Sequence, residues 1–141
     1  MNRTIIEVDY HPDNANVDFL RQKIIDFNKR YLHEKASQFN VLARDDKNHC
    51  IIGGASVWQH SDALYIDILW LEEGYRRQKL GTEIINTIAE QANKNNIKKL
   101  YVDTYDFQAV DFYVKQGFLI IAEVKNYLLE HDLVYLKKEL V

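Results

Sequence analysis

The chain has 141 residues, of which 47% are hydrophobic and 28% are charged, and its formal net charge is −3. This length and composition predict one globular domain and argue against disorder. The small negative charge gives no general attraction to nucleic acid or to an anionic membrane, so we expect neither as a partner. No apolar run approaches the roughly 20 residues of a membrane span, and the polar N-terminus predicts no signal peptide.

Cys50 is the only cysteine. It excludes an intrachain disulfide and a cysteine-based metal cluster, and it is typical of a protein in a reducing compartment. We therefore expect a cytoplasmic protein without a metal. Cys50 falls within a predicted strand, where we expect a small buried apolar side chain rather than a nucleophile.

The first elements predicted in chain order are a strand over Thr4–Val8, which alternates in polarity, and a helix. From Val17, apolar residues recur at helical spacing to about residue 35, and Asn16 is the expected N-cap.

Three strands follow, over Phe39–Arg44, Cys50–His60 and Ala63–Leu71. The short polar turns between them predict two antiparallel hairpins. Gly53 and Gly54, inside the second of these strands, predict a bulge or a close approach of the backbone.

The second half of the chain alternates between helices and strands. Its predicted elements are a helix over Gly81–Asn95, a strand over Lys99–Tyr105, a helix over Phe107–Gln116, and closing strands over Gly117–Val124 and Leu133–Leu140. A strand, helix, strand crossover predicts parallel neighbours in an otherwise antiparallel sheet. The expected fold class is therefore α+β, with a mixed, mostly antiparallel central sheet and helices on both faces.

The segment Tyr65–Thr82 predicts an anion site. An apolar strand leads through an acidic turn into a helix start that carries Arg76, Arg77 and Lys79. The unpaired backbone N–H groups and the macrodipole of a helix start favour phosphate. The spacing of the glycines matches neither a P-loop nor a dinucleotide fingerprint. The alternative is a solvated basic first turn.

Arg76-Arg77-Gln78-Lys79-Leu80-Gly81 resembles the segment with which the GNAT family of N-acetyltransferases binds the pyrophosphate of acetyl-CoA. Lys79 stands where that family usually has its first glycine, and we expect a negative φ there, which tolerates a side chain. The later run DTYDFQAVDFYVKQGF resembles the family's strand-and-helix signature, with Asp106 in place of the usual asparagine and matches at Ala109, Phe112, Tyr113, Gly117 and Phe118. The chain is similar to a small, single-domain bacterial subset of the family.

The resemblance implies that the strands Ala63–Leu71 and Lys99–Tyr105 are parallel and splay apart, and that acetyl-CoA is the cosubstrate. It assigns acyl binding to N–H groups near Leu69, Trp70 and Leu71. The remaining cofactor-binding residues that it implies are Arg76, Arg77, Gln78, Lys79, Leu80, Gly81, Thr82, Asp106, Ala109 and Phe112.

Tyr113 matches the family's tyrosine beside the CoA sulfur, which makes it the candidate acid or thiol-positioning group; the alternative is aromatic packing on the sheet. Asp67 is a carboxylate within an apolar strand, where alternation places it with Tyr65 and Leu69 on one face. If buried, it is a candidate base; otherwise it is an electrostatic seat for a cationic acceptor or a structural group. His131 is a further candidate for the acceptor site, or a loop residue.

The leading prediction is an acetyl-CoA-dependent N-acetyltransferase that acts on a primary amine of a small molecule. Direct transfer is expected because the only thiol lies outside the motifs. Alternatives are a protein lysine or N-terminal acetyltransferase, a non-catalytic CoA-binding sensor module, and a toxin acting on charged RNA, which the acidic balance disfavours. A homodimer is compatible with the resemblance.

Overall fold

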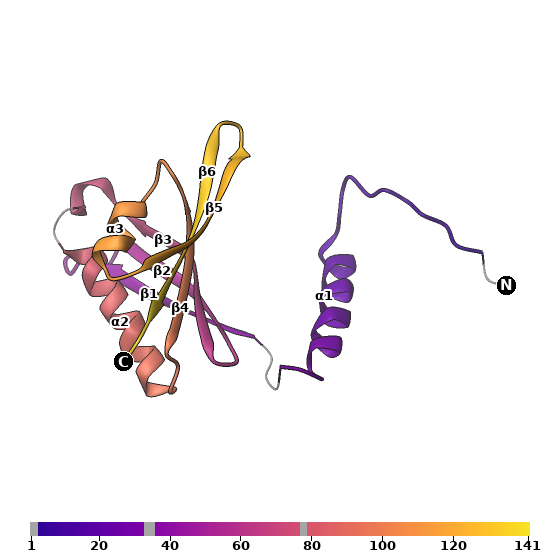
Figure 1. Cartoon of the computed structure of the whole chain (residues 1–141), viewed down its shortest axis with the longest axis horizontal. Coiled ribbons are helices and arrows are strands. Elements are labelled where there is room, and N and C mark those ends of the chain that lie inside the picture. The colour runs from indigo at the N-terminus through magenta and orange to yellow at the C-terminus, as the bar shows by residue number, and fades with distance from the viewer. Residues whose placement is uncertain (1–2, 33–35, 77–78) are drawn as a thin grey trace. The chain divides into compact units, whose positions relative to one another are not determined.

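The structure, a computed structural model, describes residues 3–32, 36–76 and 79–141. It divides into two units, Met1–Lys35 and Ala36–Val141, which are described separately (Figure 1). No helix within the described ranges is both long enough and apolar enough to cross a membrane.

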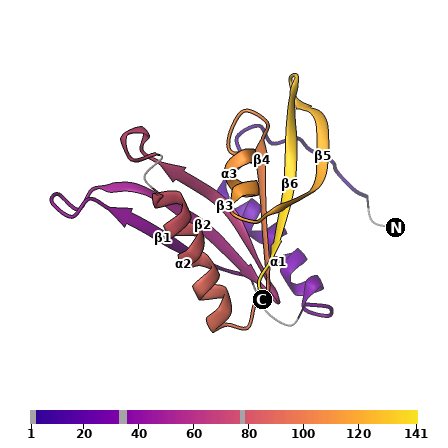
Figure 2. The ribbon, with the colours of Figure 1, turned by 60° about the vertical axis from the view of Figure 1, so that its left-hand side comes forward.

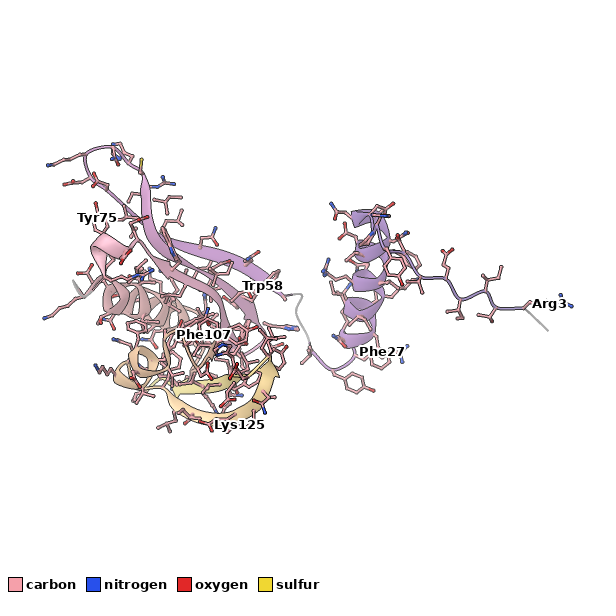
Figure 3. The ribbon with its side chains drawn as sticks, turned by 90° about the horizontal axis from the view of Figure 1, so that it is seen from above. Arg3, Phe27, Trp58, Tyr75, Phe107 and Lys125 are labelled. Carbon is pink, nitrogen blue, oxygen red and sulfur yellow. The ribbon has the colours of Figure 1, made fainter. Side chains whose placement is uncertain are left out.

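In the described part of the first unit, helix α1 covers Asn14–Asn28. It begins earlier than predicted because Asp13, not Asn16, is the N-cap: its carboxylate accepts a hydrogen bond from the Asn16 amide at 2.9 Å. None of its residues is buried, and Phe27 is one of the apolar side chains that project from it (Figure 3). The strand predicted over Thr4–Val8 is wrong, because no described strand pairs with this segment.

The second unit is built on a six-stranded sheet with the order β1-β2-β3-β4-β6-β5. Among the described strands, the pair β3 and β4 is parallel and the other neighbours are antiparallel. The strands are β1 (Ser37–Arg44), β2 (Ile51–His60), β3 (Ala63–Leu71), β4 (Lys99–Tyr105), β5 (Leu119–Leu128) and β6 (His131–Glu139). The predicted mixed sheet with one parallel pair is confirmed.

Helices α2 (Leu80–Lys94) and α3 (Val110–Lys115) belong to the same unit, with a short 3-10 turn, η1 (Glu73–Tyr75), ahead of α2. Both helices lie on one side of the strands (Figure 1). The apolar stripe of α2 (Ile84, Ile85, Ile88 and Ala92) joins the buried residues of the sheet in one core cluster, and α3 adds Tyr113. This stripe anchors the helix start that follows β3.

Strands β3 and β4 separate part of the way along their length, as Figure 2 shows. Their paired residues are Ala63–Ile66 and Lys99–Val102, and the pairing ends there. At the same point the β2–β3 register shifts, because Ser56 pairs with Ile68 and Val57 with Ile66, which leaves Asp67 as an extra residue in β3. A β-bulge of this kind bends a strand and re-aims its side chains.

Several expected bounds shift by a few residues. β5 continues to Leu128, and β6 begins at His131 rather than Leu133, so the closing hairpin is longer than predicted and projects beyond the other strands in Figure 1. Cys50 is exposed and precedes β2, so its expected burial within a strand is wrong. The close backbone approach expected at the two glycines is confirmed, since a Cβ on Gly54 would lie 2.5 Å from the Val41 carbonyl oxygen.

Candidate active site

A cavity of about 290 Å³ opens where β3 and β4 separate. Strand β3 contributes the residues around the bulge, β4 contributes its C-terminal half, and the start of α3 closes one side. Its lining residues are Ile66, Asp67, Ile68, Leu69, Val102, Asp103, Thr104, Gln108, Ala109 and Tyr113. Separated strands leave backbone N–H and C=O groups without a ladder partner, which makes this gap a natural place for a ligand.

Tyr113 reaches this cavity from α3. Its side chain is only 4% exposed and packs edge-on against Phe112 and Phe118. Among the described residues, nothing forms a hydrogen bond with its hydroxyl group. Burial, together with the negative charge of Asp103, raises the pKa of Tyr113 to about 12. The hydroxyl group is therefore protonated at neutral pH, and it can donate a hydrogen bond to a ligand.

Asp67 also lines the cavity, but its environment differs from the expected one. It is exposed, so the burial that made it a candidate base is absent. The bulge also overturns the expected faces of β3: Leu69 packs against the core that Ile66 belongs to, whereas Ile68 is 58% exposed. An extra residue reverses the two-residue alternation, and a simple alternation of side chains cannot predict that.

Asp103 is a second carboxylate in the cavity, and our interpretation of the sequence missed it. The Tyr65 hydroxyl group donates a short hydrogen bond to its Oδ2 atom. Burial and this hydrogen bond to Asp103 raise the pKa of Tyr65, so its phenol also stays protonated. The signal was present in the sequence, because Asp103, like Asp67, is a lone carboxylate within an apolar strand.

The backbone beyond the bulge supplies candidate donors for an acyl oxygen. The Glu72 amide donates to the Ile52 carbonyl at 2.8 Å, so it points toward β2. The alternation of an antiparallel ladder then directs the amides of Leu69 and Leu71 away from β2 and toward the gap, whereas that of Trp70 points toward β2.

Helix α2 begins directly after the basic turn, of which the structure describes Arg76 and Lys79. Arg77 and Gln78 lie outside the described residues. Arg76 donates through Nε to the Leu71 carbonyl at 3.1 Å, so part of its guanidinium group is used within the protein. Lys79 has φ 65°, so the expected negative φ is wrong, and the left-handed region explains why glycine suits this position.

Three of the predicted cofactor residues, at the start of α2, have structural contacts within the protein. A Cβ on Gly81 would lie 2.9 Å from the Phe112 ring, so glycine lets α3 approach α2. The Thr82 hydroxyl group accepts a hydrogen bond from Gln116 at 2.8 Å, which also joins the two helices. Leu80 is partly buried against the core. These contacts bring the end of β3, the start of α2 and α3 together.

Asp106 stands at the end of β4, next to the start of β6. Its carboxylate accepts hydrogen bonds from the Asp132 amide at 2.9 Å and pairs with His131 Nδ1 at 3.1 Å. The ring of His131 lies edge-on to Phe107, which is labelled in Figure 3, with 4.8 Å between centroids. Asp106 thus supports the turn between β5 and β6, and His131 has the carboxylate partner that the sequence could not reveal.

The turn from β4 into α3 is held by side chains as well. Gln108 accepts hydrogen bonds from the Tyr105 amide and from the Thr104 hydroxyl group, at 2.9 and 3.2 Å. The Ala109 amide donates to Thr104. This network fixes the position of α3 and therefore of Tyr113. Within the described ranges, no group of three or more His, Cys, Asp or Glu side chains could hold a metal ion.

A mixed sheet with a splayed parallel pair and a helix start beyond it is the arrangement that the family resemblance implied. The chain matches the model of the acetyltransferase (GNAT) family over residues 5–118, and it therefore belongs to that family.

Similar proteins are acetyltransferases. Blasticidin-S acetyltransferase from Streptomyces morookaense is 32% identical over 65 residues, which is 45% of this chain and 48% of that protein. The match therefore spans about half of the length of that relative. The crystal structure of an acetyltransferase from Bacillus cereus has a TM-score of 0.81 and 21% identity, and the match covers 95% of this chain and 98% of the other. An aminoglycoside 6'-N-acetyltransferase complexed with coenzyme A has a TM-score of 0.65 at 14% identity, over 92% and 95% of the two chains.

Proposed function

We propose that this protein is an acetyl-CoA-dependent N-acetyltransferase that transfers the acetyl group directly to a primary amine of a small molecule. One observation carries the proposal: Tyr113 is a buried residue that lines the cavity at the point where β3 and β4 separate, and its hydroxyl group has no protein partner among the described residues. Family membership supports the cosubstrate.

The described residues fit acetyl-CoA, which when bound supplies an activated acetyl thioester. The first amides of α2, at Leu80, Gly81 and Thr82, have no carbonyl partner within the helix and would hold the diphosphate. Lys79 is exposed beside them and adds a positive charge. The amides of Leu69 and Leu71 would donate to the acyl oxygen as negative charge develops there.

The roles of Asp67 and Tyr113 follow from their two environments. Asp67 is exposed at the bulge, so it holds the ammonium group of the acceptor by its charge, and the amine gives its protons to solvent before and as the C–N bond forms and the C–S bond breaks. With a pKa of about 12, Tyr113 is a weak acid. Complete proton transfer from it to a thiolate whose thiol has a pKa of about 8.5 would be uphill by about 5 kcal/mol. We therefore assign Tyr113 the role of hydrogen-bond donor to the departing sulfur, which then takes a proton from solvent.

The acceptor is a small molecule rather than a protein in this proposal. The cavity is at the lower end of the size range of small-ligand sites. Among relatives, the names blasticidin-S acetyltransferase and aminoglycoside 6'-N-acetyltransferase describe enzymes that act on small molecules. We also propose one functional domain across both units, because the family match spans residues in each. A cytoplasmic location is a further proposal, based on the lone cysteine.

The test is titration calorimetry with acetyl-CoA, followed by thiol release with diamines, amino acids, aminoglycosides and lysine peptides. We expect micromolar binding and release with a small amine. Tyr113→Phe keeps the ring and should lower kcat by about 10- to 100-fold, the value of one hydrogen bond to a charged group, while the Kd of acetyl-CoA changes little. Tyr10→Phe is the matched control, because Tyr10 is 84% exposed. Binding without release for any amine would support a sensor module instead, and release only with peptides would support a protein acetyltransferase.

A further inference from the structure

The cavity between β3 and β4 contains one more carboxylate than the proposed reaction uses. Asp67 and Asp103 both line it, and the lining residues that the structure describes include no lysine or arginine. In the proposed reaction Asp67 holds the reacting amine by its charge, whereas Asp103 has no assigned role. This inference rests on the proposed function, and it concerns the chemical class of the acceptor.

Asp103 is held in place but is not neutralised. Tyr65 donates one hydrogen bond to Oδ2, although an ionised carboxylate has about four acceptor positions. No ion pair of Asp103 occurs among residues 3–32, 36–76 and 79–141. Lys137, a cation on the neighbouring strand β6, pairs with Glu139 at 3.0 Å and lies over the Tyr101 ring. The negative charge of Asp103 therefore remains available to a ligand.

The second polar group of the cavity cannot balance this charge. Tyr113 is only 4% exposed and lines the cavity, and its hydroxyl group has no protein partner among the described residues. Because the phenol is protonated at neutral pH, it is a neutral donor. A ligand that places one positive charge at Asp67 leaves Asp103 unbalanced, and a carboxylate in a partly enclosed site favours a cation.

We propose that Asp103, positioned by Tyr65, binds a second positive charge of the acceptor, so that the acceptor is a small molecule with at least two cationic groups. One amine reacts beside Asp67 and Tyr113, and the other forms an ion pair with Asp103. Asp103 is then a specificity-determining residue. Tyr65 is a positioning residue, because its hydrogen bond keeps the carboxylate of Asp103 facing the cavity.

The test uses matched probes: linear diamines of three to six carbons, and amino alcohols of the same lengths in which a hydroxyl group replaces one amine. Each probe is titrated into the full chain saturated with CoA, so that affinity is measured without turnover. At least one diamine should bind about 10- to 100-fold more tightly than its amino alcohol, the value of one hydrogen bond between charged groups. Asp103→Asn should remove most of this preference and leave the affinity of the amino alcohol within about threefold.

Three controls separate this role from a structural one. Asp46→Asn removes the same charge from an exposed turn and should leave the preference unchanged. Tyr65→Phe should reduce the preference less than Asp103→Asn does. With acetyl-CoA and the best diamine, Asp103→Asn should raise KM while kcat falls by less than about threefold. If Asp103→Asn does not fold, the wild-type preference for the diamine decides the question, and this preference should weaken at high salt, because salt screens charge interactions that are partly exposed.

Equal affinities for diamine and amino alcohol in the wild-type protein, or binding of neither, would overturn the inference. A fall in kcat at constant KM in Asp103→Asn would also overturn it, since that result assigns Asp103 to proton transfer. Absence of acetyl-CoA binding would instead refute the proposed function, so the two failures are distinguishable.

Discussion

The contact between Gly81 and Phe112 gives a quantitative prediction for Gly81→Ala. Gly81 is buried at the start of α2, and an added Cβ would lie 2.9 Å from two atoms of the Phe112 ring and 3.4 Å from Leu71 Cδ1. Real Cβ atoms do not approach other heavy atoms that closely, so the ring or the helix must move. Overpacking of a well-packed site costs about 1 to 3 kcal/mol.

An alanine also has a favourable effect, because it reduces the conformational entropy of the unfolded chain by about 0.4 to 1 kcal/mol. The middle values of these two ranges give a net loss in the free energy of unfolding of about 1 to 2 kcal/mol, and the extremes reach from about 0 to about 2.6 kcal/mol. For a chain of 141 residues, each kcal/mol lowers Tm by about 4 °C, so the expected decrease is about 4 to 8 °C.

Urea and thermal unfolding of the full chain measure this effect, and Gly74→Ala is the matched control. A Cβ on Gly74 would have nothing within 4 Å, so this variant has the entropic gain without the overpacking. Phe112→Leu in the Gly81→Ala background should recover part of the loss, because a smaller side chain relieves the contact. Equal stability of Gly81→Ala and Gly74→Ala, or full additivity with Phe112→Leu, would refute the reasoning.

Three further predictions follow from single contacts. The pKa of Tyr113 is about 10 in an unfolded chain and about 12 in the folded protein, so the protein loses stability as pH rises from 10 toward 12. Between pH 9 and pH 11, the free energy of unfolding measured in urea should fall by about 1.4 kcal/mol less in Tyr113→Phe than in the wild-type protein. Lys79→Gly should be more stable than Lys79→Ala by about 1 kcal/mol, since φ 65° favours glycine, and equal unfolding midpoints would contradict that conformation. Thr82→Val should lose about 1 kcal/mol with its hydrogen bond to Gln116, whereas calorimetry should find the Kd of acetyl-CoA changed by less than about threefold; a larger change would assign Thr82 to the cofactor.

Much of the fold could be predicted because its signals are local. The apolar periodicity from Gly81 to Asn95 predicted α2 within one residue at each end, and β3 and β4 were predicted with the bounds that the structure has. The two motifs predicted a helix start after β3, and they predicted that Tyr113 lies in the helix after β4. Errors were greatest at Thr4–Val8, where alternation alone cannot show whether a strand has a partner to pair with.

The site was less predictable, because it depends on contacts between residues that are distant in sequence. Asp67 was identified as a carboxylate in an apolar strand, but its exposure results from a bulge in the β2–β3 ladder. Asp103 is positioned by a hydrogen bond from Tyr65, which lies 38 positions earlier in the sequence. His131 acquires a carboxylate partner in Asp106 only because β4 and β6 are neighbours.

The amino-acid sequence by itself determined the order of elements from the first helix onward, the family and the position of the helix start, since hydrophobic periodicity and short motifs are properties of neighbouring residues. Only the tertiary structure decided that Asp67 and Asp103 line one cavity, where the parallel strands part, and that Lys79 adopts a left-handed conformation. These features arise from strand pairing and from the packing of α2 and α3 against one sheet, and a one-residue shift in that pairing would redirect every side chain around the cavity.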